Sequence, residues 1–68
     1  MQAIKPDLLK QTREELGMTQ AEFAKAIHLS VRTIQDWELR GVAKGPAAIL
    51  IWLISKMPKQ ALRVLKDF

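Results

Sequence analysis

The sequence lacks several residue types that small proteins use for crosslinks and for chemistry. None of its 68 residues is a cysteine, which excludes disulfides, thiolate metal sites and cysteine nucleophiles. The single histidine, His28, has no carboxylate cluster at metal-ligand spacing, so neither a zinc site nor a catalytic triad is expected. A Gly-rich phosphate loop is missing too. We therefore expect no enzyme, no metal and no cofactor.

Long apolar runs are also missing. The longest, residues 47–54, has eight residues, whereas a helix needs roughly 20 to span a bilayer. The first ten residues carry Lys5 and Asp7 and have no apolar stretch typical of a secretory signal. These absences predict a cytoplasmic protein with no membrane segment.

The composition that remains is that of a folded chain. Apolar residues make up 49% and charged residues 26%, which is far from the composition of disordered segments. The length allows one domain, residues 1–68. A net charge of +4 points to a polyanionic partner. The indication is weak, because the basic excess lies in residues 46–68 and not in the third helix.

Apolar spacing and end signals predict an all-α fold with five short helices and no strand. Gly17 suits the left-handed position after the first helix, and Gly41 the end of the third. Thr19 and Glu22 form a capping box before the second helix, and Ser30 is an N-cap for the third. The predicted helices cover residues 7–16, 20–27, 31–40, 46–57 and 59–68, with Pro46 in the first turn of the fourth and Pro58 as a break before the fifth.

The second and third helices, joined by a three-residue turn, match a helix-turn-helix unit whose second helix fits the major groove. Residues 19–24, Thr-Gln-Ala-Glu-Phe-Ala, together with Ile34 and the pair Trp37-Glu38, resemble the signature of the phage-repressor and Cro-like, Xre-type helix-turn-helix family. The resemblance covers roughly residues 8–45. It implies a compact lambda-repressor-like fold, with the helix-turn-helix unit at about 20–39, and sequence-specific DNA binding.

Some positions of this signature have physical roles. Ala24 must be small where the two helices cross, and the apolar residues around it fill the shared core. His28 stands where the family usually has glycine at a positive φ, so we expect a slightly strained turn. The resemblance also implies a structural ion pair between Arg13 and Glu38; the alternative is that Arg13 contacts a phosphate.

The candidate DNA contacts lie mainly on the outward face of the third helix. Arg32 can donate two bonds to guanine, although it can equally be a surface charge. Asp36 can pair with Arg32 four residues away or accept from cytosine. The resemblance implies that Gln20 bonds a phosphate and braces the recognition helix.

The remaining candidates have less specific roles. Val31 and Thr33 offer methyl groups to thymine or act as filler, and Arg40 and Lys44 suit backbone contacts or only solubilise the surface. The full set of candidate DNA-binding residues is Gln20, Ser30, Val31, Arg32, Thr33, Gln35, Asp36, Arg40 and Lys44.

The fourth helix is apolar around its whole circumference at residues 49–54, which one small monomer cannot easily cover. We expect a homodimer with residues 46–68 serving as core and interface; the alternative is that this is simply the central core helix. The candidate interface residues are Trp52, Leu62, Leu65 and Phe68.

Two functions follow from these expectations. The first is a dimeric repressor of its own or a neighbouring operon, which binds an inverted repeat in double-stranded DNA. The second is an antitoxin-like module that neutralises a toxin or other protein partner through its C-terminal helices, because residues 46–65 are similar to short Xre-type regulators encoded beside toxins.

Overall fold

The computed structural model describes residues 3–68, and within that range the chain forms five helices and no strand. The helices are α1 (Pro6–Glu15), α2 (Gln20–Ala26), α3 (Val31–Arg40), α4 (Pro46–Lys56) and α5 (Pro58–Lys66). The prediction of an all-α fold with five helices is confirmed. None of the helices in the described part has the length and apolar content that a bilayer crossing requires.

Proline stands at the start of three helices. Pro6, Pro46 and Pro58 occupy the first helical turn, where a backbone N–H has no partner inside the helix and its loss costs little. The predicted fifth helix, residues 59–68, was therefore wrong at its start, because Pro58 begins the helix. It was also wrong at its end, because α5 stops at Lys66, after which the amide of Asp67 bonds only three residues back to the Val64 carbonyl at 3.2 Å.

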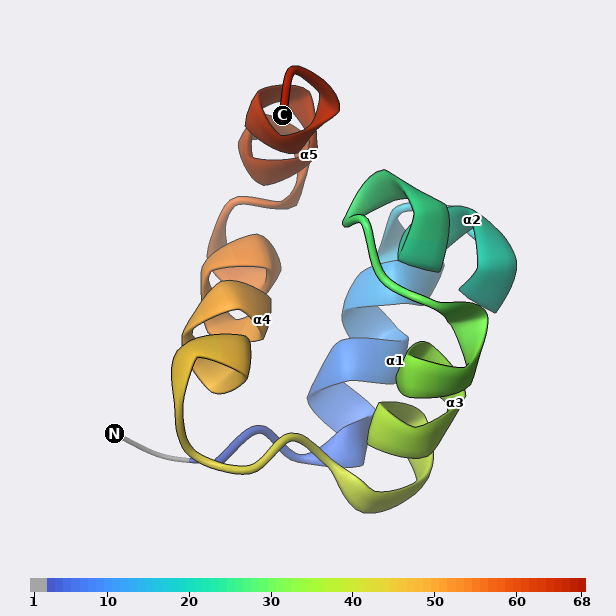
Figure 1. The fold of residues 1–68 in the computed structure, drawn as a ribbon, viewed down its shortest axis with the longest axis vertical. Helices are drawn as coiled ribbons and strands as arrows, with labels where there is room; N and C mark the ends of the chain where they lie inside the picture. Colours follow the sequence, from blue (N-terminus) through green and yellow to red (C-terminus); the bar gives the residue numbers. More distant parts are fainter. Residues whose placement is uncertain (1–2) are drawn as a thin grey trace.

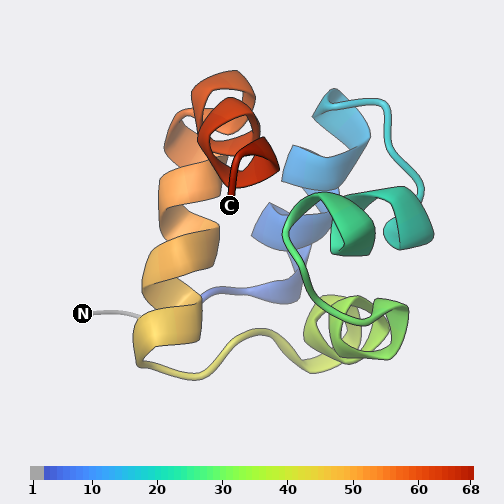
Figure 2. The same cartoon turned by 45° about the horizontal axis from the view of Figure 1, so that its top comes forward.

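The helices form two groups that share one core. Helices α1 and α2 both pack on α3, and α4 with α5 lies along the side of this group (Figure 1). In the turned view, α5 lies between α4 and the α2 end of the first group (Figure 2), and α5 contacts both. The largest side chains with no exposed surface come from four helices: Leu9, Phe23, Ile34, Ile51 and Ile54.

Residues 3–5, here called the N-terminal arm, pair with the loop after α3, a contact that was not predicted from the sequence. Ile4 and Val42 exchange two backbone hydrogen bonds, of 2.9 and 2.8 Å, and both side chains are buried. Gly41, beside this bridge, has φ +88°, and a Cβ there would lie 2.6 Å from the Ile4 carbonyl oxygen. Glycine is therefore required both for the backbone conformation and for the close approach of the arm.

Candidate nucleic-acid interface

Side-chain caps define where α2 and α3 begin. The Thr19 hydroxyl accepts from the Glu22 amide at 3.1 Å, while the Glu22 carboxylate accepts from the Thr19 amide at 2.8 Å, which confirms the capping box. The Ser30 hydroxyl accepts from the Thr33 amide at 3.2 Å and is also bonded to the Thr33 hydroxyl at 2.8 Å. The predicted N-cap role of Ser30 is thus confirmed.

His28 adopts the conformation expected from its place in the turn. Its φ of +63° is the only positive value at a non-glycine residue in the described part of the chain. The Leu29 amide bonds to the Ala24 carbonyl at 2.9 Å and the His28 amide to the Lys25 carbonyl at 3.2 Å. These two bonds form a Schellman motif, in which the residue after the helix is left-handed.

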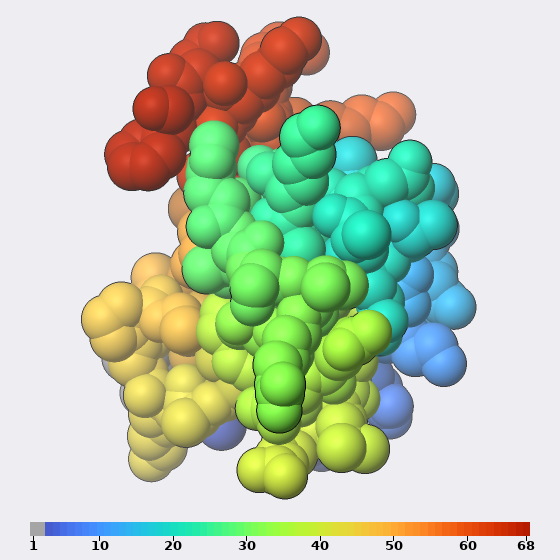
Figure 3. All heavy atoms as spheres, turned by 45° about the vertical axis from the view of Figure 1, so that its right-hand side comes forward, coloured from blue at the N-terminus to red at the C-terminus, as the bar shows by residue number. Residues whose placement is uncertain are grey.

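The outward face of α3 is open to solvent. Only Ile34 of this helix is buried, and Trp37 packs partly against the core. Leu39 is 75% exposed. Most of the candidate DNA-binding residues are exposed, namely Ser30, Val31, Arg32, Gln35, Asp36, Arg40 and Lys44, whereas Gln20 and Thr33 are half-buried. The green and yellow-green atoms of α3 occupy the middle of the face in Figure 3, with α2 beside them.

The ion pair on the outward face of α3 differs from the predicted pair between Asp36 and Arg32. Asp36 pairs with Arg40, at 3.4 Å between the carboxylate and Nε, and not with Arg32. Both side chains are mostly exposed, at 53% and 76%, so this pair is weak. Among residues 3–68, Arg32 and Lys44 have no ion-pair partner, which leaves two uncompensated positive charges on or beside α3.

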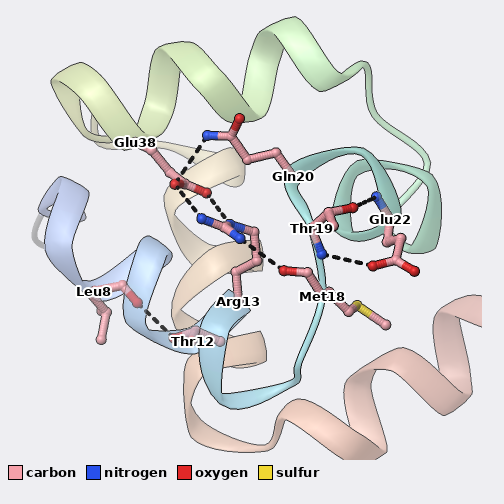
Figure 4. A network of polar contacts seen from close by, with 8 residues as sticks. All are labelled: Leu8, Thr12, Arg13, Met18, Thr19, Gln20, Glu22 and Glu38. Carbon is pink, nitrogen blue, oxygen red and sulfur yellow. Dashed lines mark hydrogen bonds and ion pairs between the residues drawn. The ribbon is translucent and has the colours of Figure 1, made fainter.

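A polar network joins α3 to α1 and α2 (Figure 4). Arg13 donates to both carboxylate oxygens of Glu38, from Nε at 2.6 Å and from Nη2 at 3.1 Å. Nη1 of Arg13 donates to the Met18 carbonyl at 2.8 Å, and Nε2 of Gln20 donates to Glu38 at 3.2 Å. The side chains of Arg13 and Glu38 are only 12% and 7% exposed, so this two-bond pair holds α3 in a fixed position.

The network also changes the acidity of its members. Burial raises the pKa of the Glu38 carboxyl, but the hydrogen bonds from Arg13 and Gln20 and the charge of Arg13 outweigh it, so the pKa lies below its ordinary value. The hydrogen bond to Glu38 raises the pKa of Arg13. Both groups are therefore charged at neutral pH.

A second surface, on α4 and α5, is apolar and exposed. Trp52 is 51% exposed and Phe68 92% exposed, whereas Leu62 and Leu65 are half-buried against the protomer's own core. Other large apolar residues on these helices and the turn between them are exposed too but were not among the predicted interface residues, namely Ile49, Leu53, Met57 and Val64. The signal for the α4 members was present, because they lie on the side of the helix away from Ala48, Ile51 and Ile54 at 100° per residue.

Two apolar grooves run beside α4. One lies between α4 and the N-terminal arm and is lined by residues that include Ile4, Leu8 and Trp52. The other lies between α4 and α5 and is lined by residues that include Leu53 and Val64. Exposed apolar side chains line both grooves, among them Ile49 and Trp52 in the first and Leu53 and Val64 in the second.

Comparisons with known proteins support this description. The helix-turn-helix family matches residues 9–57, which include all of α2, α3 and α4 and most of α1. Antitoxin HigA-2 from Vibrio cholerae serotype O1 (strain ATCC 39315 / El Tor Inaba N16961) is 37% identical over 57 residues, which cover 82% of this chain and 55% of that protein. The chain thus spans about half the length of this relative.

Proposed function

This chain belongs to the Xre-type helix-turn-helix family, and from that premise we propose that it is a sequence-specific, DNA-binding transcriptional regulator. In this proposal residues 1–68 act as one DNA-binding domain that places α3 in the major groove. The observation that carries the proposal is the solvent-exposed face of α3, held in position by the bonds from Arg13 and Gln20 to Glu38.

Direct base reading is assigned to the first two turns of α3. Arg32 is exposed and has no acidic partner among residues 3–68, so its guanidinium is available for the O6 and N7 atoms of guanine. Val31 and Gln35 are exposed on the same helix, where a methyl group can meet thymine and an amide can meet adenine. The Ser30 and Thr33 hydroxyls, which already bond each other, lie at the start of the same helix.

Backbone contacts are assigned to residues around the reading helix. Only one Nε2 hydrogen of Gln20 is needed for Glu38, so the second remains for a phosphate. Arg40 and Lys44 are exposed at the end of α3 and in the loop after it, and both suit phosphate contacts. Asp36, which is paired with Arg40, either reduces the positive charge at the C-terminal end of α3 or accepts a hydrogen bond from cytosine N4.

Selection of bound duplexes from a random pool tests the proposal. We expect the wild type to select a defined site. Arg32→Ala should weaken the binding free energy for that site by about 1–3 kcal/mol and relax the preference at one base pair. Arg40→Ala should weaken the affinity for all sequences equally and make the slope of log affinity against log salt concentration flatter by about one. Lys59→Ala, an exposed basic residue on α5, is the matched control. Recovery of random sequences, or wild-type affinity in both α3 variants, would refute the assigned face.

The proposed regulator is a repressor that acts as a homodimer. Large apolar side chains are exposed along α4 and α5, with Trp52 at 51% and Val64 at 71% exposed, and exposed apolar surface of this kind marks protein interfaces. The interface includes Trp52 and Phe68, and Leu62 and Leu65 contribute only their exposed edges.

A two-fold dimer predicts the form of the DNA site. The two copies of α3 would enter grooves about 34 Å apart, so the site is an inverted repeat whose half-site centres are about 10 base pairs apart or a multiple of that. Trp52→Glu places a charge on the interface but not in the protomer core, so the variant stays folded. In sedimentation equilibrium we expect a wild-type dimer and a monomeric variant with little affinity for the repeat. A wild-type monomer with a single non-repeated site would contradict both parts.

A second candidate function is suggested by the relative that is named an antitoxin. In this case the apolar surface of α4 and α5 binds a toxin, and DNA binding is secondary or absent. Co-expression with the product of an adjacent reading frame separates the two functions. A stable complex that Trp52→Glu abolishes supports the antitoxin role, whereas an inverted repeat in the chain's own promoter that the wild type binds supports the repressor role.

A further inference from the structure

Helices α1 and α2 end in the same way but with different residues at the critical position. After α1, the Met18 amide bonds to the Arg13 carbonyl at 3.2 Å and the Gly17 amide to the Glu14 carbonyl at 3.0 Å, which is the same Schellman motif as after α2. Gly17 has φ +70° and His28 has φ +63°. Glycine adopts this conformation without steric cost and histidine does not, so the turn after α2 carries a strain that the turn after α1 lacks.

The His28 side chain connects the α2–α3 turn to the end of α5. Its Nε2 atom lies 2.7 Å from the Leu65 carbonyl oxygen, and because a carbonyl only accepts, Nε2–H is the donor. The ring also meets the ring of Phe68 edge-on, with centroids 5.4 Å apart and an interplanar angle of 67°. A glycine at position 28 would make neither contact.

These contacts lie at a junction between two parts of the molecule. On one side, Ser30 caps α3 two residues after His28, so the turn leads directly into the reading helix. On the other, α5 is attached mainly to α4 and contacts the first three helices chiefly through α2. Apart from Ala61, no residue of α5 is fully buried, and Leu62 and Leu65 are only half-buried against the core, so few side chains hold α5 in place.

We propose that His28 is a positioning residue that couples α5 to the α2–α3 turn, so that the docking of α5 on α2 and the placement of α3 depend on each other. The inference rests on the proposed role of α3 in DNA reading. One hydrogen bond and one aromatic contact at an exposed site shift the equilibrium between docked and undocked α5 by about two- to tenfold toward the docked state. By thermodynamic linkage, if docking of α5 changes the affinity for DNA by some factor, then DNA binding changes the docking equilibrium of α5 by the same factor.

The coupling itself is tested in the free protein by amide hydrogen exchange. Phe68→Ala removes the ring that follows α5 and meets the His28 ring, so we expect about two- to tenfold faster exchange at Leu29 and Thr33, whose amides bond to the Ala24 carbonyl and to the Ser30 hydroxyl. Arg63→Ala, an exposed change on the same helix, should leave both amides unchanged. Wild-type exchange at both amides in Phe68→Ala would overturn the proposal.

Two variants at position 28 separate the ring from the backbone. His28→Gly removes the ring and relieves the turn, and His28→Asn removes the ring while retaining a residue that tolerates positive φ. In both, the amides of residues 62–66 should exchange about two- to tenfold faster than in the wild type, while α1 amides do not change. Slower or equal exchange in α5 of both variants would show that the ring does not hold α5.

A DNA-bound measurement distinguishes coupling from a purely structural contact. A saturating duplex that carries the selected site should slow α5 exchange in the wild type and should have no effect on α5 in His28→Gly. Equal slowing in both proteins would overturn the role of His28. If the wild type binds no duplex, the proposed function fails, while the exchange of Leu29 and Thr33 in free Phe68→Ala still decides the coupling.

Discussion

Replacing Glu38 with glutamine changes one charged group in the contact between α1 and α3 while keeping the volume of the side chain. The carboxylate accepts three hydrogen bonds, two from Arg13 and one from Gln20. A glutamine amide has one oxygen and presents an NH₂ group in place of the other. At least one donor of Arg13 or Gln20 then faces another donor instead of an acceptor.

The expected loss follows from the burial of this pair. A nearly buried donor without a partner costs about 1–3 kcal/mol, and removing one partner of a buried ion pair costs about 3–5 kcal/mol. With side chains 12% and 7% exposed, we expect Glu38→Gln to lower the free energy of unfolding by about 3 kcal/mol. A chain of this size is stable by only about 3–10 kcal/mol, and the loss corresponds to a fall in Tm of about 12–24 °C.

Urea and thermal unfolding followed by circular dichroism measure this loss. The matched control is Asp36→Asn, which breaks the exposed pair with Arg40 and should cost less than about 1 kcal/mol. A stability for Glu38→Gln within about 0.5 kcal/mol of the wild type would show that the network does not hold α3.

Three further predictions concern acid stability, the Gly41 approach and the α2–α3 crossing. Because the folded-state pKa of Glu38 is lowered, its contribution to stability is complete above the ordinary value of about 4.3 and is lost as pH falls below it; unfolding at pH 2–7 should show a smaller acid loss in Glu38→Gln. Gly41→Ala should cost more than about 2 kcal/mol, whereas Gly17→Ala, which has open space, should cost about 1 kcal/mol in the same urea titrations. Ala24→Leu should cost about 1–3 kcal/mol, and the exposed Ala21→Leu almost nothing, as differences in Tm would report.

Features that depend on neighbouring residues could be predicted from the sequence. Thr19, Glu22 and Ser30 act on amides within three positions of themselves, so their caps follow from local spacing alone. The positive φ of His28, by contrast, was expected only from the resemblance to a family that usually has glycine at this position. The outward face of α3 was predicted because helical periodicity separates Ile34 from the polar residues.

Features that depend on distant parts of the chain could not be predicted from local patterns, and the pair between Arg13 and Glu38 was expected only from the family resemblance. The bridge between Ile4 and Val42 uses backbone groups, which every residue carries and which leave no signature in the sequence. The contact of His28 with Leu65 requires the position of α5, which no local pattern specifies. The apolar run of α4 indicated uncovered surface, but its composition alone could not tell that Ile49 and Leu53 would be exposed while Leu62 and Leu65 would be half-covered.

The bridge between Ile4 and Val42 also fixes the two ends of the segment that contains α1, α2 and α3. The entropic cost of closing a loop grows only slowly with its length, so one pair of backbone hydrogen bonds closes a segment of three helices at little more cost than a short turn. A change that opens the bridge, such as a side chain at Gly41, therefore loosens the entry to α1 and the exit from α3 together.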